Sequence, residues 1–254
     1  MSWFAPVGLA FRALRRRIVL LLVFGSVFIV AAAAARLVTG SHEGHLELDR
    51  LFEIGGAPLA SALLLLGWVI GRFPLIATLA LLAGVFSHDQ AHGYSRLYAA
   101  RPVWWPGVYA ARIAVLSALA FAFSAVLMPA FDLILLGDWA GRNTLVLIAA
   151  YVVTYGSLTA LLSAWTRADA WVALAIAVLA IAWHALRTAG ALDGTPPGVR
   201  EAVTLVLPPQ GALVAIEAAY AQQLPIPWPA FLHVSIYGAL LLVLAGTSIG
   251  TREI

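Results

Sequence analysis

Histidines occur twice at spacings that could bind a metal ion. His88 and His92 are four residues apart, so on a helix their imidazoles would lie on one face and could share a cation. His42 and His45 flank an acid in a polar segment. Neither pair has a third ligand at a comparable spacing. We therefore interpret His88 and His92 as solvated residues at a helix end, predict no metal centre, and retain only His42 and His45 as metal candidates.

A serine and a histidine in neighbouring apolar segments could form a catalytic dyad. Ser157 and His184 would suit intramembrane serine proteolysis, in which the imidazole takes the proton of the hydroxyl. The surrounding GSLT sequence lacks the G-x-S-G pattern of rhomboid-like proteases, and the predicted spans place the two side chains at different depths. We expect Gly156 and Ser157 to allow close helix packing instead. His184 and His233 could ligate one haem, which is a second enzymatic alternative.

Arg72 is the only basic residue inside an apolar segment. A charge at membrane depth costs several kcal/mol, so such a residue is treated as functional by default. We predict that Arg72 is an intramembrane charge with an acidic partner, for which Glu53 is one candidate. The alternatives are that its side chain reaches water at the outer surface, or that it caps a helix break at Pro74.

Polar and helix-breaking residues gather between Asp89 and Arg112, in the sequence DQAHGYSRLYAARPVWWPGVYAAR. Residues 91–100 can form a short helix with two tyrosines and a leucine on one face. Pro102 ends that helix, because its ring disfavours helical backbone at the residue before it. We predict an interfacial helix joined rigidly to two spans, which could pass a displacement from a cytoplasmic partner to both. The alternative is an ordinary cytoplasmic loop anchored by its aromatic residues.

The composition requires that these residues be positioned by membrane-spanning helices. Hydrophobic residues make up 63% of the 254 residues and charged residues only 11%, whereas soluble domains have about 25% charged residues. The apolar runs are continuous and do not alternate, which excludes a transmembrane barrel. The chain has no cysteine, so disulfides and thiolate chemistry are excluded. Its arginines are scattered at predicted membrane borders, which does not favour binding to nucleic acid.

The apolar runs predict an all-α fold with six transmembrane helices in a single transmembrane domain over residues 1–254. Residues 3–14 precede the first span and have the pattern of an interfacial elbow helix. The second run is too long for one upright span, so we predict a tilted helix kinked at Pro74. A long loop over 187–229 precedes the last span. The predicted spans are 18–37, 58–87, 108–131, 144–165, 171–186 and 230–249.

The distribution of charge predicts the orientation of these spans. Nine arginines and three acids lie on the side that holds both termini, against five arginines and nine acids on the other side. Basic residues favour the cytoplasmic side. Both termini and the segment from Asp89 to Arg112 are therefore predicted to be cytoplasmic.

No part of the sequence predicts nucleotide hydrolysis by this chain. The P-loop pattern G-x-x-x-x-G-K-[ST] is absent, and none of the fifteen basic residues is a lysine. We predict that the chain is not an enzyme, and that any ATP used for transport is bound by another polypeptide.

The segment from Ser87 to Arg112 resembles the loop between the second and third spans of ABC-type-2 export permeases. That loop typically has an acid, then a glycine, a leucine, a small residue followed by Arg-Pro-Val, and finally a tyrosine and a basic residue. The positions that match in order are Asp89, Gly93, Leu97, Ala100, Arg101, Pro102, Val103, Tyr109 and Arg112. Residues 71–87 resemble the second span of these proteins, and the Leu207-Pro208-Pro209 stretch resembles their outer segment, which often dips into the membrane. Trp104-Trp105-Pro106 departs from the usual serine-rich run.

The resemblance implies a multi-pass permease of a bacterial-type plasma (inner) membrane, which would form half of an ATP-driven exporter. Its coupling helix would dock on a separate ABC ATPase subunit that binds ATP and Mg²⁺. A homodimer or a pair of permeases would complete the transporter, with no cofactor on this chain. The residues to which the resemblance assigns partner coupling are Asp89, Gly93, Tyr94, Leu97, Arg101, Pro102 and Val103.

Two other classes of function are compatible with six spans. One is the intramembrane enzyme described above, either a rhomboid-like serine protease or a haem protein. The other is a non-catalytic membrane assembly factor. The residues do not predict the substrate.

Overall fold

The secondary structure of the described chain is helical. The computed structural model describes residues 4–39, 69, 71–91, 105–135, 137 and 139–250, with side chains over 15–34, 69, 71–91, 107–134, 137 and 139–249. No strand occurs within these ranges, and the predicted all-α fold class is confirmed. The helices of the described residues are α1 (Phe4–Thr39), α3 (Phe73–Leu82), α4 (Ser87–Ala91), α6 (Trp105–Leu135), α7 (Arg142–Trp165), α8 (Asp169–Thr188), α9 (Pro197–Val206), α10 (Gln210–Ala221) and α11 (Trp228–Gly250).

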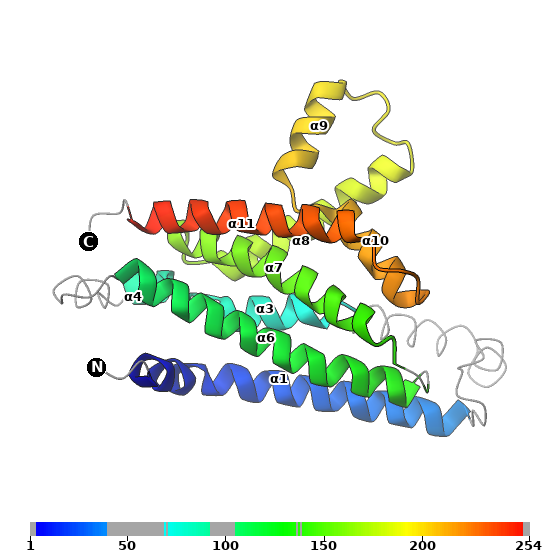
Figure 1. Ribbon diagram of the computed structural model, residues 1–254, viewed down its shortest axis with the longest axis horizontal. Coiled ribbons are helices and arrows are strands. Elements are labelled where there is room, and N and C mark those ends of the chain that lie inside the picture. The colour runs from blue at the N-terminus through cyan, green and yellow to red at the C-terminus, as the bar shows by residue number, and fades with distance from the viewer. Residues whose placement is uncertain are drawn as a thin grey trace.

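The long helices form a bundle with two distinct ends. α1, α6, α7 and α11 lie side by side with their axes roughly aligned, and α9 projects away from them (Figure 1). The beginning of α1 and the end of α11 lie at the same end of the bundle, which we call the terminal end. The opposite end, which we call the distal end, holds the end of α6 and the beginning of α7 (Figure 1).

Five helices are long and apolar enough to cross a membrane. Their apolar stretches are Arg15–Ala34, Gly107–Ile134, Arg142–Trp165, Asp169–Thr188 and Trp228–Ile249. Each coincides with a predicted span, namely 18–37, 108–131, 144–165, 171–186 and 230–249. A helix of this length and hydropathy requires a lipid environment. The chain is therefore a multi-pass membrane protein.

α7 is the central helix of the bundle. Two thirds of its apolar stretch (67%) is buried, whereas 17–22% is buried in the other four. Glycines allow its neighbours to approach closely: a Cβ on Gly238 of α11 would lie 2.4 Å from Val153 Cγ1. Gly156 of α7 faces Ser117 of α6, whose Oγ would lie 3.4 Å from an added Cβ. Small residues at helix crossings are how membrane bundles obtain tight packing.

The second predicted span is described only in part. Residues 58–87 are described from Val69 onward, and α3 covers Phe73–Leu82 of them. The shape of the span before Val69 stays a prediction. Val69 and Gly71 are helical and a break at Arg72 precedes α3, so the helical path is interrupted two residues before Pro74. Pro74 lies in the first turn of α3, where its missing N–H costs nothing. The helix then ends before residues 83–86, a turn that we call the polar turn and that leads into α4. Gly84 has a φ of +69° in this turn, a conformation that suits glycine.

α1 is continuous from Phe4 to Thr39, so its backbone does not separate an elbow helix from the first span. The side chains of residues 4–14 lie outside the described set. An interfacial position for these first turns stays a prediction.

The segment between α8 and α11 is helical, where the sequence predicted a loop over 187–229. α9 and α10 are bent by 63° at a break around Pro208 and Pro209. α7 and α8 are joined by a short turn and run in opposite directions, so α8 ends at the distal end. α11 begins near the start of α7, since Asn143 Nδ2 donates to the carbonyl of Leu224 at 2.8 Å. Both ends of this segment therefore lie at the distal end, and the α9–α10 pair is re-entrant.

Candidate coupling site

The polar turn is bonded to three other helices. Its Gly84 N–H donates to Asp169 Oδ2 at 2.7 Å, at the beginning of α8. The N–H groups of Phe86 and Ser87 both donate to Ser163 Oγ of α7, at 2.9 and 3.1 Å. Arg17 of α1 donates from Nη1 to the carbonyl oxygens of Ala80 and Ala83. A helix break inside an apolar bundle must have its backbone groups satisfied by protein, and here side chains do so.

Asp169 is suited to this position by its place in the helix. It lies in the first turn of α8, where the partial positive charge of the helix stabilises a carboxylate. Its Oδ1 accepts from the N–H of Ala170 at 2.8 Å, and the residue is 3% exposed. The carboxylate therefore binds its own helix and the polar turn at once.

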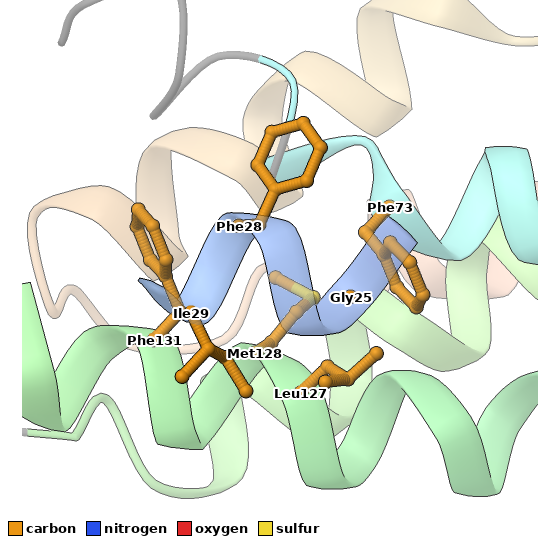
Figure 2. Close-up of a pocket in the computed structure, with 7 residues that line it drawn as sticks. All are labelled: Gly25, Phe28, Ile29, Phe73, Leu127, Met128 and Phe131. Atoms are coloured by element: carbon orange, nitrogen blue, oxygen red, sulfur yellow. The ribbon is translucent and has the colours of Figure 1, made fainter. Parts of the chain in front are cut away.

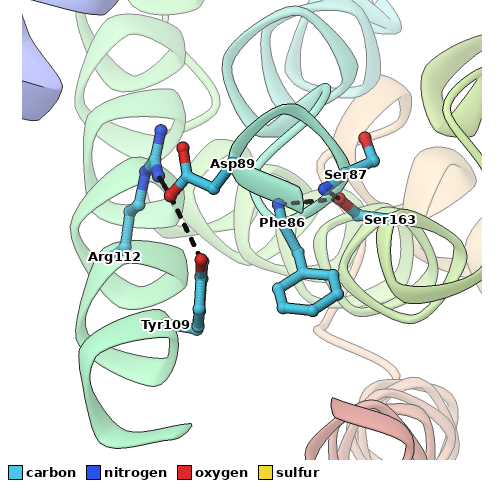
Figure 3. A network of polar contacts seen from close by, with 6 residues as sticks. All are labelled: Phe86, Ser87, Asp89, Tyr109, Arg112 and Ser163. Carbon is cyan, nitrogen blue, oxygen red and sulfur yellow. Dashed lines mark hydrogen bonds and ion pairs between the residues drawn. The ribbon is translucent and has the colours of Figure 1, made fainter. Parts of the chain in front are cut away.

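Asp89 connects α4 to the beginning of α6. Arg112 Nη1 lies 2.7 Å from Asp89 Oδ2, and the Tyr109 hydroxyl donates to the same oxygen at 3.2 Å. Figure 3 shows both side chains of α6 reaching toward Asp89, beside the contacts of Ser163 with the backbone of Phe86 and Ser87. Phe86 also packs edge-on against the ring of Tyr109, with centroids 4.9 Å apart. We call Asp89, Tyr109 and Arg112 the Asp89 clamp.

The clamp is largely buried, and burial determines the free-energy cost of removing one of its charged residues. The side chains of Asp89 and Arg112 are 9% and 21% exposed, and Tyr109 is 1% exposed. Removing one partner of such an ion pair leaves an uncompensated charge and typically costs about 3–5 kcal/mol. The clamp thus ties α4 to the beginning of α6.

Of the residues predicted to couple to a partner, only Asp89 is described. Its carboxylate points inward to α6, so in this structure it positions α4 and is not presented to a docking protein. The pairing of Asp89 with Arg112 was not predicted, although both residues matched the loop pattern. The other predicted coupling residues lie outside the described residues; they are Gly93, Tyr94, Leu97, Arg101, Pro102 and Val103.

A second polar cluster surrounds Arg72. Arg72 Nη2 lies 3.1 Å from Glu217 Oε2 of α10, and the Tyr151 hydroxyl of α7 donates to Glu217 Oε1. Tyr155 stacks on Tyr151 with ring centroids 5.9 Å apart. Tyr151 lies nine residues into α7, about 14 Å along the helix from its start. We call Arg72, Tyr151 and Glu217 the distal cluster.

Arg72 has an acidic partner inside the bundle, and this partner is Glu217. The candidate named from the sequence, Glu53, lies outside the described residues. The side chain of Arg72 is 16% exposed, which is far from a side chain extended into water. Glu217 was missed as a site residue. The available signal was that it is an isolated acid in the apolar run ALVAIEAAYA, just as Arg72 is an isolated base in its own run.

Three further hydrogen bonds hold α10 in place. The Tyr220 hydroxyl donates to Asp132 Oδ1 of α6 at 2.6 Å. Asn143 Nδ2 of α7 donates to the carbonyls of Ala219 and Leu224, at 2.9 and 2.8 Å. Ala219 lies in the last turn of α10 and Leu224 three residues beyond it, so Asn143 binds both the end of the helix and the turn that follows. The re-entrant helix is thus attached to α3, α6 and α7 by polar contacts.

The candidate catalytic residues are placed separately. Ser157 directs its hydroxyl to the carbonyl of Val153 at 2.7 Å, with that of Thr154 at 3.0 Å, within its own helix. His184 instead lies beside Gly211 at the start of α10. Within the described residues, no group of three or more His, Cys, Asp or Glu side chains could hold a metal ion. His42, His45 and His92 lie outside them.

A comparison of the chain with protein-family models, curated proteins and solved structures found no match.

Proposed function

We propose that this chain is the membrane-spanning permease subunit of an ATP-driven ABC exporter, with both termini cytoplasmic. The proposal rests on its apolar helices, on the loop that resembles ABC-type-2 permeases, and on the contacts of the Asp89 clamp. A separate ATPase subunit would bind ATP and Mg²⁺ and dock on residues 92–103. Two permease chains would enclose the path of the substrate.

The observation that carries the proposal is the buried contact of Asp89 with Tyr109 and Arg112. It joins α4, which precedes the proposed docking segment, to α6, which follows it. A force applied to residues 92–104 would therefore move both flanking helices together. An ordinary connecting loop does not need such a buried ion pair at its base.

The polar turn extends this linkage. Through Arg17, Ser163 and Asp169 it is bonded to α1, α7 and α8. Displacement of α4 would thus reach α1, α7 and α8 as well as α3 and α6, which adjoin it. Rigid elements joined in this way can switch as a unit between two packings, which is what alternating access requires.

The distal cluster would receive the displacement at the other end of α3. It connects α3, which begins directly after Arg72 and ends at the polar turn, to the re-entrant helix α10. Movement of α3 would pull on Glu217 through Arg72. We assign to this ion pair the role of passing a displacement of the proposed docking segment, residues 92–103, on to α10.

The test is the ATPase activity of a reconstituted complex. The chain would be co-expressed with an ABC ATPase from the same genetic neighbourhood, purified, and placed in nanodiscs. We expect a stable complex in which vanadate-sensitive ATP hydrolysis depends on the permease. Gly93→Trp and Arg101→Glu should abolish complex formation or this stimulation, since both alter the docking segment.

Arg112→Gln tests the clamp separately from docking. The complex should still form, because Arg112 faces Asp89, but stimulation of ATP hydrolysis should fall severalfold. Arg167→Gln is the matched control, because Arg167 is an exposed arginine in the turn between α7 and α8. Failure to form any complex with the ATPase, or full stimulation by Arg101→Glu, would contradict the proposed function.

A further inference from the structure

A pocket lies at the distal end, where α8 meets the break between α9 and α10. Its polar lining comes from Trp183, His184 and Arg187 of α8, Thr204 of α9, and Gln210 with Gly211 at the start of α10. No acidic residue lines it. The pocket is separate from the clamp and from the distal cluster.

The cationic side of the pocket is held in place by Thr204. Its hydroxyl oxygen accepts from Trp183 Nε1 at 3.1 Å and from Arg187 Nη1 at 3.2 Å. Thr204 in turn donates to the carbonyl of Arg200 at 2.7 Å. In the described chain Arg187 has no carboxylate within ion-pair distance, whereas its neighbour Arg200 pairs with Asp193 at 3.5 Å. Arg187 therefore brings an uncompensated positive charge to the pocket.

The start of α10 contributes a second attraction for an anion. The N–H groups of Gln210, Ala212 and Leu213 are bonded to Pro208 and Pro209. The N–H of Gly211 lies in the first turn, where a helix leaves donors free and carries partial positive charge. An added Cβ on Gly211 would lie 3.5 Å from His184 Cε1, so the imidazole stands directly beside this turn.

Gln210 gives an independent indication of a ligand. It is 5% exposed and lines the pocket, and its Oε1 is buried without a hydrogen-bond partner in the described structure. Leaving a buried carbonyl unpaired typically costs about 1–3 kcal/mol. Oε1 can only accept, so a ligand that satisfies it donates from an N–H or O–H group, such as an amine or a hydroxyl.

We propose that this pocket binds a phosphoryl group that carries a neighbouring amine or hydroxyl, as in the headgroup of phosphatidylethanolamine or phosphatidylglycerol. The phosphate oxygens would accept from Arg187, the Gly211 N–H and His184, and the amine or hydroxyl would donate to Gln210 Oε1. Apolar residues for acyl chains flank the pocket: Leu205 and Val206 of α9 are 78% and 75% exposed. Trp183 is the residue type that favours the headgroup layer.

The experiment is lipid binding by the full chain, delipidated in detergent and titrated with single lipids under native mass spectrometry. We expect phosphatidylethanolamine and phosphatidylglycerol to bind about tenfold more tightly than phosphatidylcholine, whose headgroup has no donor for Gln210. Diacylglycerol, which lacks the phosphate, should bind no more than a background lipid. Inorganic phosphate should displace the lipid if the free ion is the occupant, and leave it bound if the lipid is.

Two variants and a control separate binding from folding. Arg187→Gln should weaken the preferred lipids about tenfold, while Arg200→Gln should leave them unchanged. Gln210→Leu should weaken them as well, yet raise or preserve the melting temperature of the lipid-free protein, because it removes an unsatisfied buried group. Equal binding of phosphatidylcholine or diacylglycerol, or unchanged affinity in both pocket variants, would overturn the proposal.

Discussion

At the scale of single residues, two ion pairs of the described chain join helices that are distant in sequence. Asp89 pairs with Arg112 near the terminal end, and Arg72 with Glu217 toward the distal end. An isolated charge in an apolar bundle is costly, so each of these residues depends on its partner. Such dependence can be measured, because removing both partners should cost less than the two single losses suggest.

The mutual dependence of two paired charges can be tested in the distal cluster. Glu217→Gln should lower the melting temperature, since it leaves Arg72 without a counter-charge, and Arg72→Gln should do the same. The double variant should recover much of the loss, and the swapped pair Arg72→Glu with Glu217→Arg should recover part of it. Thermal unfolding in detergent followed by tryptophan fluorescence would show this. Asp193→Asn is the control, because that side chain is 79% exposed; additive losses in the double variant would argue against coupling.

Ser163 provides a second test at this scale. Ser163→Ala leaves the N–H groups of Phe86 and Ser87 without their acceptor, and we expect a loss of about 2–4 kcal/mol in the free energy of unfolding. Ser235→Ala is the matched control. The hydroxyl of Ser235 donates only to the carbonyl of Phe231 in its own helix, which already has a backbone role. Equal effects of the two substitutions in chemical denaturation would show that Ser163 does not hold the polar turn.

At the scale of elements, the long spans were predictable and the breaks were not. Five spans follow from runs of about 20 apolar residues, because lipid permits little else for such a run. The end of α3 at Leu82 depends on acceptors supplied by Ser163 and Asp169, which are some 80 residues away in the sequence. No local pattern reports such contacts. The helices α9 and α10 were not predicted either. The prolines of this segment favour a loop, but in the structure they lie at helix starts, since α9 begins at Pro197 and α10 at Gln210, directly after Pro209.

Helix packing between α7 and α11 can be tested with two glycines of the same helix. A Cβ at Gly238 would lie 2.4 Å from Val153 Cγ1 and 3.2 Å from its carbonyl oxygen, so Gly238→Ala should force the helices apart. Gly246 has open space around it, and Gly246→Ala should be neutral or stabilise by up to about 1 kcal/mol through helix propensity. Melting temperatures in the same detergent would distinguish the two. A similar response to both would mean that close packing at Gly238 is not required.

An apolar pocket lies between α1, α3 and α6. It is lined by Gly25, Phe28 and Ile29 of α1, Phe73 of α3, and Leu127, Met128 and Phe131 of α6 (Figure 2). Phe73 stacks on Phe24 with centroids 6.2 Å apart. No polar side chain lines this pocket, so it contributes packing and no chemistry to the account above.

At the scale of the whole molecule, polar contacts between helices gather in two places, the polar turn with the Asp89 clamp and the distal cluster. α3 runs from the distal cluster to the polar turn, and α4 continues to the Asp89 clamp. The sequence predicted where the candidate site lies in the chain but not the contacts within it. The pattern from Asp89 to Arg112 identified the segment, but the inward direction of Asp89 and the pairing of Arg72 with Glu217 depend on tertiary contacts.

We expect that ATP binding by the proposed ATPase subunit, which would dock on residues 92–103, changes the position of α10 at the distal end. The Asp89 clamp would transmit this change. Because the sequence contains no cysteine, spin labels can be placed at Val30→Cys of α1 and Leu224→Cys after α10, both exposed side chains. Double electron–electron resonance would then measure the distance between them in the complex with its ATPase, with and without ATP and vanadate. We predict that trapping shifts this distance in the otherwise unaltered chain and that Arg112→Gln removes the shift while the complex stays intact. A distance that does not respond to nucleotide, or a full response in Arg112→Gln, would contradict the account.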